Sequence, residues 1–369
     1  MIINKKIDDK SIVWFQDNNE YIIVEPLVAE ILTLLKNKVD KTQIITNLFN
    51  SINIPLKQAD NLVLDIETLL KTTTKELSEI EPLKPPTSFK YQKKYQINDV
   101  IIEVDYQSDF EVSLVHPKFA HLEINSEQEA KYYYKVYSNK DFISFSVNDE
   151  IINTWNINEV HYFQGKFSMK IVEHIHQKNE SKWLGVFHAS AISNNKESML
   201  FLGDSGNGKS TSLALLQAND FTCLADDFVP IDAEKQEVYS FPSAISIKKN
   251  SLETLFPIYP ELKTSAEYHF KRLNKIVRYL PPNNSNYTAH LPCKALVFIK
   301  YEKDSDLKLK EISTITAFEQ LVPDSWLSPI SENAEAFLNW FSKLPCYQLT
   351  YSNNDKMVKT VSKIFNNDL

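Results

Sequence analysis

The N-terminal part of the chain changes its hydrophobic period at about residue 25. Apolar residues first form two short runs, at 11–15 and 21–24, separated by a polar turn, which is typical of a β-hairpin. Beyond this point the apolar positions recur at the spacing of amphipathic helices. The three helical segments start near Pro26, Asp40 and Pro55. The pattern therefore predicts a small α+β domain over residues 1–72.

Residues 73–89 are polar and rich in proline, which favours an extended and semi-rigid linker. Beyond the linker, residues 90–160 contain several β-like runs. They are expected at 99–106, 131–137 and 142–147, with a hairpin leading into 151–154. We expect these strands to join the sheet of a second domain that spans residues 90–369.

The central part of the chain alternates between strand and helix patterns, which predicts an α/β fold with a mixed sheet. Apolar runs at 186–192 and 198–202 are expected to be paired strands, and residues 209–216 have apolar positions at helical spacing. A further strand at 221–225 ends in Asp226-Asp227. Later strands are expected at 294–301 and 308–312, and later helices at 332–341 and 355–365.

The turn between the second strand and the helix has the P-loop pattern G-x-x-x-x-G-K-[ST]. It contains three of the five glycines in the chain, which suits a loop whose backbone N–H groups surround phosphates. Lys209 would reach the β- and γ-phosphates of ATP, and the Ser210 hydroxyl would ligate Mg²⁺. The residues expected to bind the nucleotide are Gly203, Asp204, Ser205, Gly206, Asn207, Gly208, Lys209, Ser210 and Thr211.

Asp226 and Asp227 follow a strand beside this loop, at the sheet edge where open α/β proteins bind ligands. Adjacent carboxylates on an extended backbone point in different directions, so one can serve Mg²⁺ and the other can accept a proton. The residue pattern by itself leaves open which of Asp226 and Asp227 takes each role. The alternative is an ordinary Asp-Asp turn at a strand end.

His188 lies in the apolar run that pairs with the strand before the loop. This pairing could bring the imidazole close to the γ-phosphate. The alternative is a core histidine with satisfied hydrogen bonds.

Three segments together resemble the catalytic core of the bacterial HPr kinase/phosphorylase family, whose P-loop architecture is shared by phosphoenolpyruvate carboxykinases. These segments are His188-Ala189-Ser190, Gly203 to Ser210, and Ala225-Asp226-Asp227. The resemblance implies that Asp227 is the base toward a substrate hydroxyl, Lys209 the phosphate clamp and Ser210 the Mg²⁺ ligand. It also implies that His188 is an active-site partner, and it leaves Asp226 as the second carboxylate, which we assign to Mg²⁺. It covers roughly residues 165–250.

The second signature of that family, an acidic residue followed by an Arg-Gly-rich stretch, is missing. Residues 241–249 read Phe-Pro-Ser-Ala-Ile-Ser-Ile-Lys-Lys in its place, without the glutamate that would complete the metal site. This stretch resembles the HPr-kinase-related proteins of bacterial peptide-modification clusters, in which Lys248 would line the phosphate or acceptor site. Alternatively, Lys248 and Lys249 form a solvated pair at a strand end.

A basic run follows, and it is the expected source of a further phosphate clamp because arginine can grip phosphate oxygens with two parallel bonds. We assign Arg278 to the nucleotide site, with Arg272 as the other candidate. The alternative is a solvated helix face. The run consists of His269, Lys271, Arg272, Lys275 and Arg278.

The N-terminal domain, with its winged-helix-like order of elements, resembles the PqqD-like domain that holds leader peptides of ribosomally made natural products. The resemblance implies that a peptide or small-protein substrate adds a strand to the edge of the hairpin at residues 11–24. The alternative is a small accessory helical domain. On this interpretation the protein is an ATP-dependent phosphotransferase that acts on a serine or threonine hydroxyl of a precursor peptide.

Two other functions remain open: a non-catalytic, nucleotide-switched peptide carrier and a kinase of a free metabolite such as serine. Net charge −8 disfavours nucleic acid as a partner. No signal peptide or membrane span is apparent, and three widely spaced cysteines suit a reducing compartment, so a cytoplasmic location is expected. A homo-oligomer is compatible with the sequence.

Overall fold

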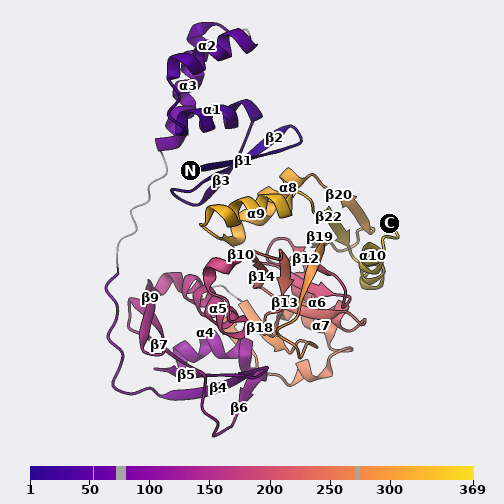
Figure 1. Ribbon diagram of the computed structural model, residues 1–369. Helices are drawn as coiled ribbons and strands as arrows, with labels where there is room; N and C mark the ends of the chain where they lie inside the picture. Colours follow the sequence, from indigo (N-terminus) through magenta and orange to yellow (C-terminus); the bar gives the residue numbers. More distant parts are fainter. Residues whose placement is uncertain (53, 72–79, 271–274) are drawn as a thin grey trace. The chain divides into compact units, whose positions relative to one another are not determined.

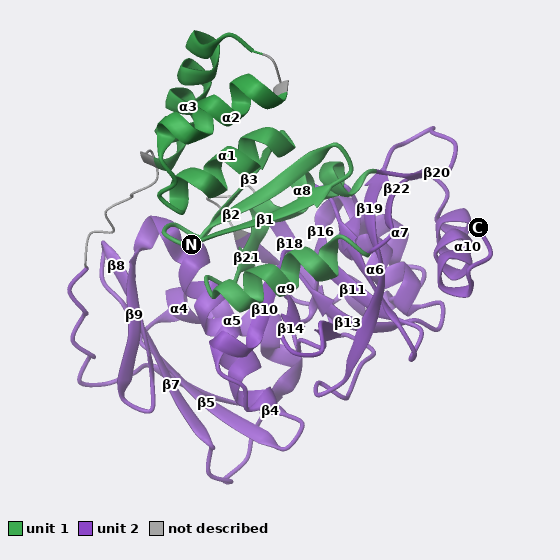
Figure 2. Ribbon diagram, turned by 45° about the horizontal axis from the view of Figure 1, so that its top comes forward, with its two compact units in different colours: residues 1–78, 313–343 green, residues 79–312, 344–369 purple. Residues whose placement is uncertain are grey.

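The computed structural model describes residues 1–52, 54–71, 80–270 and 275–369, and Ile52, Lys71, Phe270 and Lys275 are described by their backbone alone. These residues divide into two compact units (Figure 2). One unit combines the N-terminal region, Met1–Ser78, with Ser313–Lys343, and the other contains Glu79–Ile312 and Leu344–Leu369. The segment 313–343 thus belongs with the N-terminal region, whereas the sequence pattern assigned it to the second domain.

The N-terminal unit contains the predicted hairpin and three helices, with an additional strand in front. The strands β1 (Ile2–Ile7), β2 (Lys10–Phe15) and β3 (Glu20–Val24) form an antiparallel sheet in the order β1-β2-β3. Because β1 pairs with β2, the outer strand of the predicted hairpin is β3. The helices are α1 (Pro26–Lys36), α2 (Lys41–Ile52) and α3 (Leu56–Lys71).

Local signals in the sequence account for the helix starts. Pro26 occupies the first turn of α1, where its missing N–H costs nothing. The Asp40 carboxylate accepts a hydrogen bond from the Gln43 backbone N–H at 3.2 Å and so caps α2. α1 packs against the sheet, and α3 packs against α1 and α2, so that Val13, Leu32 and Val63 share one core.

The segment 313–343 contributes a second set of elements to this unit. It forms α8 (Thr314–Leu321), β21 (Ser325–Leu327) and α9 (Ser331–Phe341). The Tyr21 ring of β3 packs edge-on against Phe318 of α8 and Phe337 of α9, with ring centroids 5.8 and 5.7 Å apart. The Asn19 side-chain amide also donates to the Leu327 carbonyl oxygen at 2.8 Å. These contacts explain why 313–343 clusters with the N-terminal region.

The second unit begins with a six-stranded sheet in the order β6-β4-β5-β7-β8-β9. Its strands are β4 (Tyr91–Ile97), β5 (Val100–Tyr106), β6 (Glu123–Ile124), β7 (Tyr132–Ser138), β8 (Phe142–Val147) and β9 (Glu150–Asn156). Our expectation that these strands join the P-loop sheet is wrong, because they form a sheet of their own.

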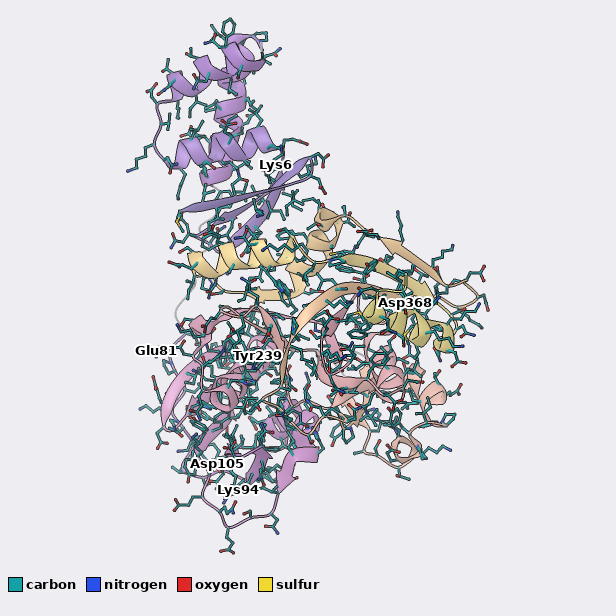
Figure 3. All side chains as sticks on the ribbon, turned by 45° about the vertical axis from the view of Figure 1, so that its right-hand side comes forward. Lys6, Glu81, Lys94, Asp105, Tyr239 and Asp368 are labelled. Atoms are coloured by element: carbon teal, nitrogen blue, oxygen red, sulfur yellow. The ribbon has the colours of Figure 1, made fainter. Side chains whose placement is uncertain are left out.

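This sheet is separate because it has its own covering helices, α4 (Asp109–Phe119) and α5 (Val160–His176) (Figure 1). Phe167 of α5 packs against Phe145 and Tyr134 on the strands, with ring centroids 5.2 and 5.3 Å apart. Polar residues alternate with these core positions, as Lys94 and Asp105 illustrate in Figure 3.

The P-loop lies on a second, mixed sheet of the same unit. Within this unit its strands run in the order β13-β11-β12-β19-β15-β14-β10, and β22 and β20 extend it from β19. β12 and β22 run parallel to β19, whereas β11 is antiparallel to both β12 and β13. The bounds are β10 (Trp183–Phe187), β11 (Ser190–Ser193), β12 (Ser198–Leu202), β13 (Thr222–Asp226), β14 (Val229–Asp232), β15 (Glu237–Tyr239), β19 (His290–Tyr301), β20 (Lys308–Glu311) and β22 (Cys346–Tyr351).

The mixed α/β architecture agrees with the predicted fold class. The apolar side of α6 (Lys209–Gln217) packs into a core that also includes α10 (Asn354–Asn366) and the centre of β19. Leu213, Val297 and Val361 are fully buried there. This core holds α6, and with it the end of the P-loop, on a rigid part of the fold.

Two local predictions need correction. The run 186–192 is not one strand, because the chain turns at His188 and Ala189, where the Ala189 N–H donates to the Phe187 carbonyl oxygen at 2.9 Å. β10 then pairs with β14, while β11 pairs with β12 and β13. The described residues of the basic run lie on two strands, β17 (Tyr268–Phe270) and β18 (Lys275–Leu280), and not on a helix. Lys271 and Arg272 fall outside the described residues.

A third small sheet has the order β16-β18-β17, with β16 spanning Ile245–Lys248 and a short helix, α7 (Leu252–Leu255), after it. Among the helices that the structure describes, none has the length and apolar character needed to cross a membrane.

Candidate functional site

The P-loop follows β12 and leads into α6, as predicted. Gly203, Gly206 and Gly208 adopt φ values of +131°, +106° and +96°, which L-residues with a side chain rarely tolerate. A Cβ atom at Gly203 would lie 2.8 Å from the Ile299 carbonyl oxygen. The glycines are therefore required both by the backbone conformation and, at Gly203, by the close approach of β19.

Lys209 is buried, with 7% of its surface exposed, and its side chain turns back over the loop. Its ammonium donates to the Gly203 carbonyl oxygen and lies 3.5 Å from the Asp204 carbonyl oxygen. The next two residues point elsewhere, because Ser210 bonds to Asp226 and the Thr211 hydroxyl donates to Ser251 Oγ at 2.7 Å. The loop is thus held in shape by its own lysine.

Asp226 ends β13 and is almost completely buried. It accepts hydrogen bonds from Ser190 Oγ at 2.6 Å and from the Ser246 backbone N–H at 3.0 Å. The Ser210 hydroxyl lies 3.2 and 3.1 Å from its two carboxylate oxygens. Burial, followed by the neighbouring charge of Asp227, raises the pKa of Asp226 to about 7, although these hydrogen bonds oppose the shift.

Asp227 points in a different direction from Asp226. Its backbone is left-handed, with φ of +63°, and its side chain is 30% exposed in the pocket. The Asp227 Oδ1 atom lies 3.9 Å from Nδ1 of His188, whose side chain is 42% exposed. His188 is therefore not a core histidine, because the turn between β10 and β11 brings it out into the pocket beside Asp227.

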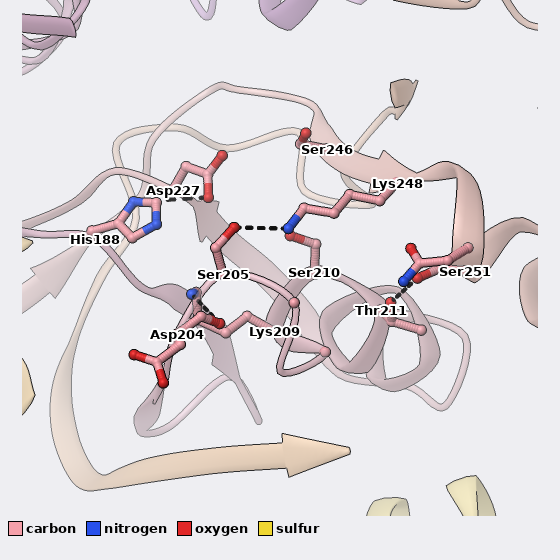
Figure 4. Close-up of a pocket in the computed structure, with 13 residues that line it drawn as sticks. His188, Asp204, Ser205, Lys209, Ser210, Thr211, Asp227, Ser246, Lys248 and Ser251 are labelled. Atoms are coloured by element: carbon pink, nitrogen blue, oxygen red, sulfur yellow. Dashed lines mark hydrogen bonds and ion pairs between the residues drawn. The ribbon is translucent and has the colours of Figure 1, made fainter. Parts of the chain in front are cut away.

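The P-loop, His188 and Asp227 line one open pocket, whose empty space, including the solvent at its mouth, is about 540 Å³ (Figure 4). The wall opposite the P-loop comes from β16 and the segment after it. The residues around the pocket are His188, Asp204, Ser205, Gly206, Gly208, Lys209, Ser210, Thr211, Asp227, Ser246, Lys248, Asn250 and Ser251. Gly203, Asn207 and Asp226 are predicted site residues that are not in this set. The Asn207 N–H donates to the Asp204 carbonyl oxygen at 3.1 Å.

Arg278 is not brought to this pocket. Its Nη1 atom donates to the carbonyl oxygens of Leu262, Lys263 and Ser265, and its Nη2 atom lies 3.4 Å from a Glu267 carboxylate oxygen. The side chain thus closes the turn before β17. Sequence reasoning could not detect this role, because the carbonyl partners carry no residue-type signal.

Three serine partners of the site were not assigned from the sequence. Ser190 and Ser246 hold Asp226, and Ser251 bonds to Thr211. Ser190 belongs to the segment His188-Ala189-Ser190 of the family resemblance, so its place in the sequence indicated a position near the site. Ser246 acts through its backbone N–H, which no sequence pattern reveals.

The oxygen donors at the site fit Mg²⁺. The cation prefers oxygen ligands and usually combines one or two protein groups with waters and substrate phosphates. Ser210 Oγ and the Asp226 carboxylate supply such donors at the edge of the P-loop. Within the described ranges there is no cluster of three or more His, Cys, Asp or Glu side chains that could hold a metal without a nucleotide.

Comparison with protein-family models and with curated proteins found no match to this chain.

Proposed function

We propose that this protein is an ATP-dependent phosphotransferase of the HPr-kinase-like type, which transfers a phosphoryl group to a serine or threonine hydroxyl. The observation that carries the proposal is the division between two adjacent carboxylates at the P-loop. Asp226 is buried against Ser210, whereas Asp227 faces the pocket beside His188. This arrangement matches the needs of phosphoryl transfer, which depends on positioning and charge stabilisation.

The loop backbone and Lys209 would bind the β- and γ-phosphates at the N-terminus of α6, where unpaired N–H groups favour anions. Asp227 would accept the proton of the attacking hydroxyl. The His188 imidazole, 3.9 Å away, would orient this carboxylate. Bound Mg²⁺ would neutralise phosphate charge, and Ser210 and Asp226 would hold it.

For the acceptor, we propose a peptide or small protein that binds to the N-terminal unit. Support comes from the winged-helix-like order of its elements and from β3, the outer strand of its sheet, whose main chain could pair with an extended peptide. Such binding would raise the effective concentration of the acceptor hydroxyl.

The proposal is tested by incubating the full-length protein with γ-labelled ATP, Mg²⁺ and a candidate precursor peptide. Lys209→Ala should abolish label transfer while the protein remains folded by circular dichroism. Lys196→Ala is the matched control, because it removes an exposed lysine in the turn before β12. This variant should transfer the label normally. Full transfer by Lys209→Ala would refute the proposal.

The same assay separates the other two functions. ATP binding without transfer to any acceptor would favour a nucleotide-switched carrier. Equal turnover of free serine and of the peptide would favour a metabolite kinase. If the N-terminal unit holds the peptide, Lys209→Ala should leave peptide affinity, measured by calorimetry, unchanged.

A further inference from the structure

Strand β16 carries a second lysine to the phosphate pocket. Ile245 and Ile247 are buried, whereas Ser246 and Lys248 line the pocket, as strand alternation requires. The Ser246 N–H donates to Asp226 at 3.0 Å, and Lys248 Nζ donates to Ser205 Oγ in the P-loop at 2.8 Å (Figure 4). One short strand therefore holds the buried carboxylate and also brings an ammonium group to the loop.

Arginine is scarce in this protein. The chain contains two arginines, Arg272 and Arg278. Arg278 is committed to three backbone carbonyls and Glu267, and Arg272 lies outside the described residues. The lysines among the residues that line the described pocket are Lys209 and Lys248, and no arginine lies in this set.

Transfer of a phosphoryl group spreads negative charge over its equatorial oxygens, and cations that face these oxygens lower the barrier. Lys209 approaches from the end of the P-loop, while Lys248 approaches from β16. The Ser205 hydroxyl, one partner of Lys248, is a neutral acceptor. An oxygen of the transferring γ-phosphoryl group is charged and forms the stronger hydrogen bond, so this group, which ADP lacks, would draw the ammonium from Ser205.

We propose that Lys248 is a second phosphate clamp, which stabilises the transferring phosphoryl group from the wall opposite the P-loop. This inference rests on the proposed phosphotransferase function. In the step itself, the bond from the γ-phosphorus to the bridging oxygen breaks and a bond to the acceptor oxygen forms. The acceptor proton passes to Asp227, and ADP carries the electron pair of the broken bond. Lys248 stays protonated and forms only hydrogen bonds.

The next residue, Lys249, offers a matched control. Its side chain is exposed and does not line the pocket, although it has the same charge and an adjacent position. If the two lysines formed only a solvated pair, their substitution would have equal effects.

The experiment compares Lys248→Met, Lys248→Arg and Lys249→Met in the full-length protein with Mg²⁺. Calorimetry measures the affinity for ADP alone and for ADP with aluminium fluoride, which mimics the transferring phosphoryl group. Lys248→Met should weaken binding of the ADP–aluminium fluoride mimic about 10²-fold, the scale for loss of one donor to transition-state charge. It should leave ADP affinity unchanged. Lys248→Arg should restore most of the loss, and Lys249→Met should behave as wild type.

Suppose that wild type binds the mimic more tightly than ADP. Equal affinities of Lys248→Met and Lys249→Met for the mimic would then overturn the inference and leave the proposed function standing. If wild type bound neither ADP nor the mimic, the proposed function would fail, and the inference with it. Lys209→Met, run in parallel, should lose affinity for ADP itself.

Discussion

The Ser210 hydroxyl of the P-loop lies 3.1 and 3.2 Å from the two oxygens of the buried Asp226 carboxylate. The next residue, Asp227, faces the pocket and lies 3.9 Å from His188. One of these adjacent carboxylates is therefore buried and the other faces the pocket. Carboxylates in environments that differ in this way typically have different roles in a reaction.

This separation predicts different effects for the two conservative substitutions. Asp227→Asn should lower turnover by about 10² to 10⁴ and leave ATP affinity near normal, since a general base acts in the transition state. Asp226→Asn should instead raise the Mg²⁺ concentration that gives half-maximal activity. Steady-state kinetics over a Mg²⁺ series measures both. Similar Mg²⁺ dependence in the two variants would mean that the roles are assigned wrongly.

The burial of Asp226 predicts a pH dependence of stability. In the unfolded chain the pKa of an aspartate is about 3.9. In the folded protein, burial and the charge of Asp227 raise the pKa of Asp226 to about 7. Between these values the native state binds more protons than the unfolded state. The contribution of Asp226 to the free energy of unfolding therefore falls as the pH rises.

Asp226→Asn removes this contribution, so the stability of wild type relative to the variant should decline from about pH 4 to about pH 7. Urea unfolding in EDTA at several pH values measures it. Burial lowers the pKa of three histidines to about 4, so their contribution to the free energy of unfolding rises with pH. This contribution is the same in wild type and variant and cancels in the difference. The histidines are His121, His174 and His176. Parallel pH profiles for the two proteins would contradict the prediction.

Two glycines predict opposite results for the same substitution. Gly203→Ala should impair nucleotide binding, because its φ is +131° and the new Cβ would lie 2.8 Å from the Ile299 carbonyl oxygen. Gly165 lies inside α5, and a Cβ there meets nothing within 4 Å. Gly165→Ala should therefore stabilise the protein by about 0.5–1 kcal/mol. Calorimetry with ADP and thermal unfolding test the pair, and normal ADP binding by Gly203→Ala would refute the loop geometry.

The packing of Tyr21 predicts that the stability of the N-terminal unit depends on residues 313–343. Its ring packs against Phe318 and Phe337, so Tyr21→Ala should cost about 2–3 kcal/mol, less than truncation of a fully buried aromatic ring, because Tyr21 is half-buried. Tyr21→Phe should be neutral or stabilising, since the buried hydroxyl has no hydrogen-bond partner among the described residues. Leu64→Ala, at a side chain that is 57% exposed, is the control. Urea unfolding of the full chain measures all three, and equal losses for Tyr21→Ala and Leu64→Ala would contradict the prediction.

The elements that depend on local signals can be predicted from the amino-acid pattern alone. The P-loop required glycines at positive φ between a strand and a helix, and the pattern around Gly203 and Lys209 expressed that requirement directly. The hairpin and the starts of α1 and α2 were equally visible, because turn residues, Pro26 and the Asp40 cap act within a few residues. The position of Asp226 and Asp227 at a strand end followed from the same short-range pattern.

The contacts between residues far apart in the chain become visible only in the folded structure. The apolar faces of 314–321 and 331–341 could have covered any sheet, and their contact with Tyr21 is a matter of packing that no local period encodes. The same holds for the separate sheet formed by β4 to β9, since hydrophobic alternation indicates that a strand is buried on one side but not which sheet it joins. Arg278 and Lys248 looked alike as basic residues. Arg278 is held by carbonyl oxygens around Leu262, whereas Lys248 reaches Ser205, because backbone partners and strand direction, and not charge, set where a long side chain ends.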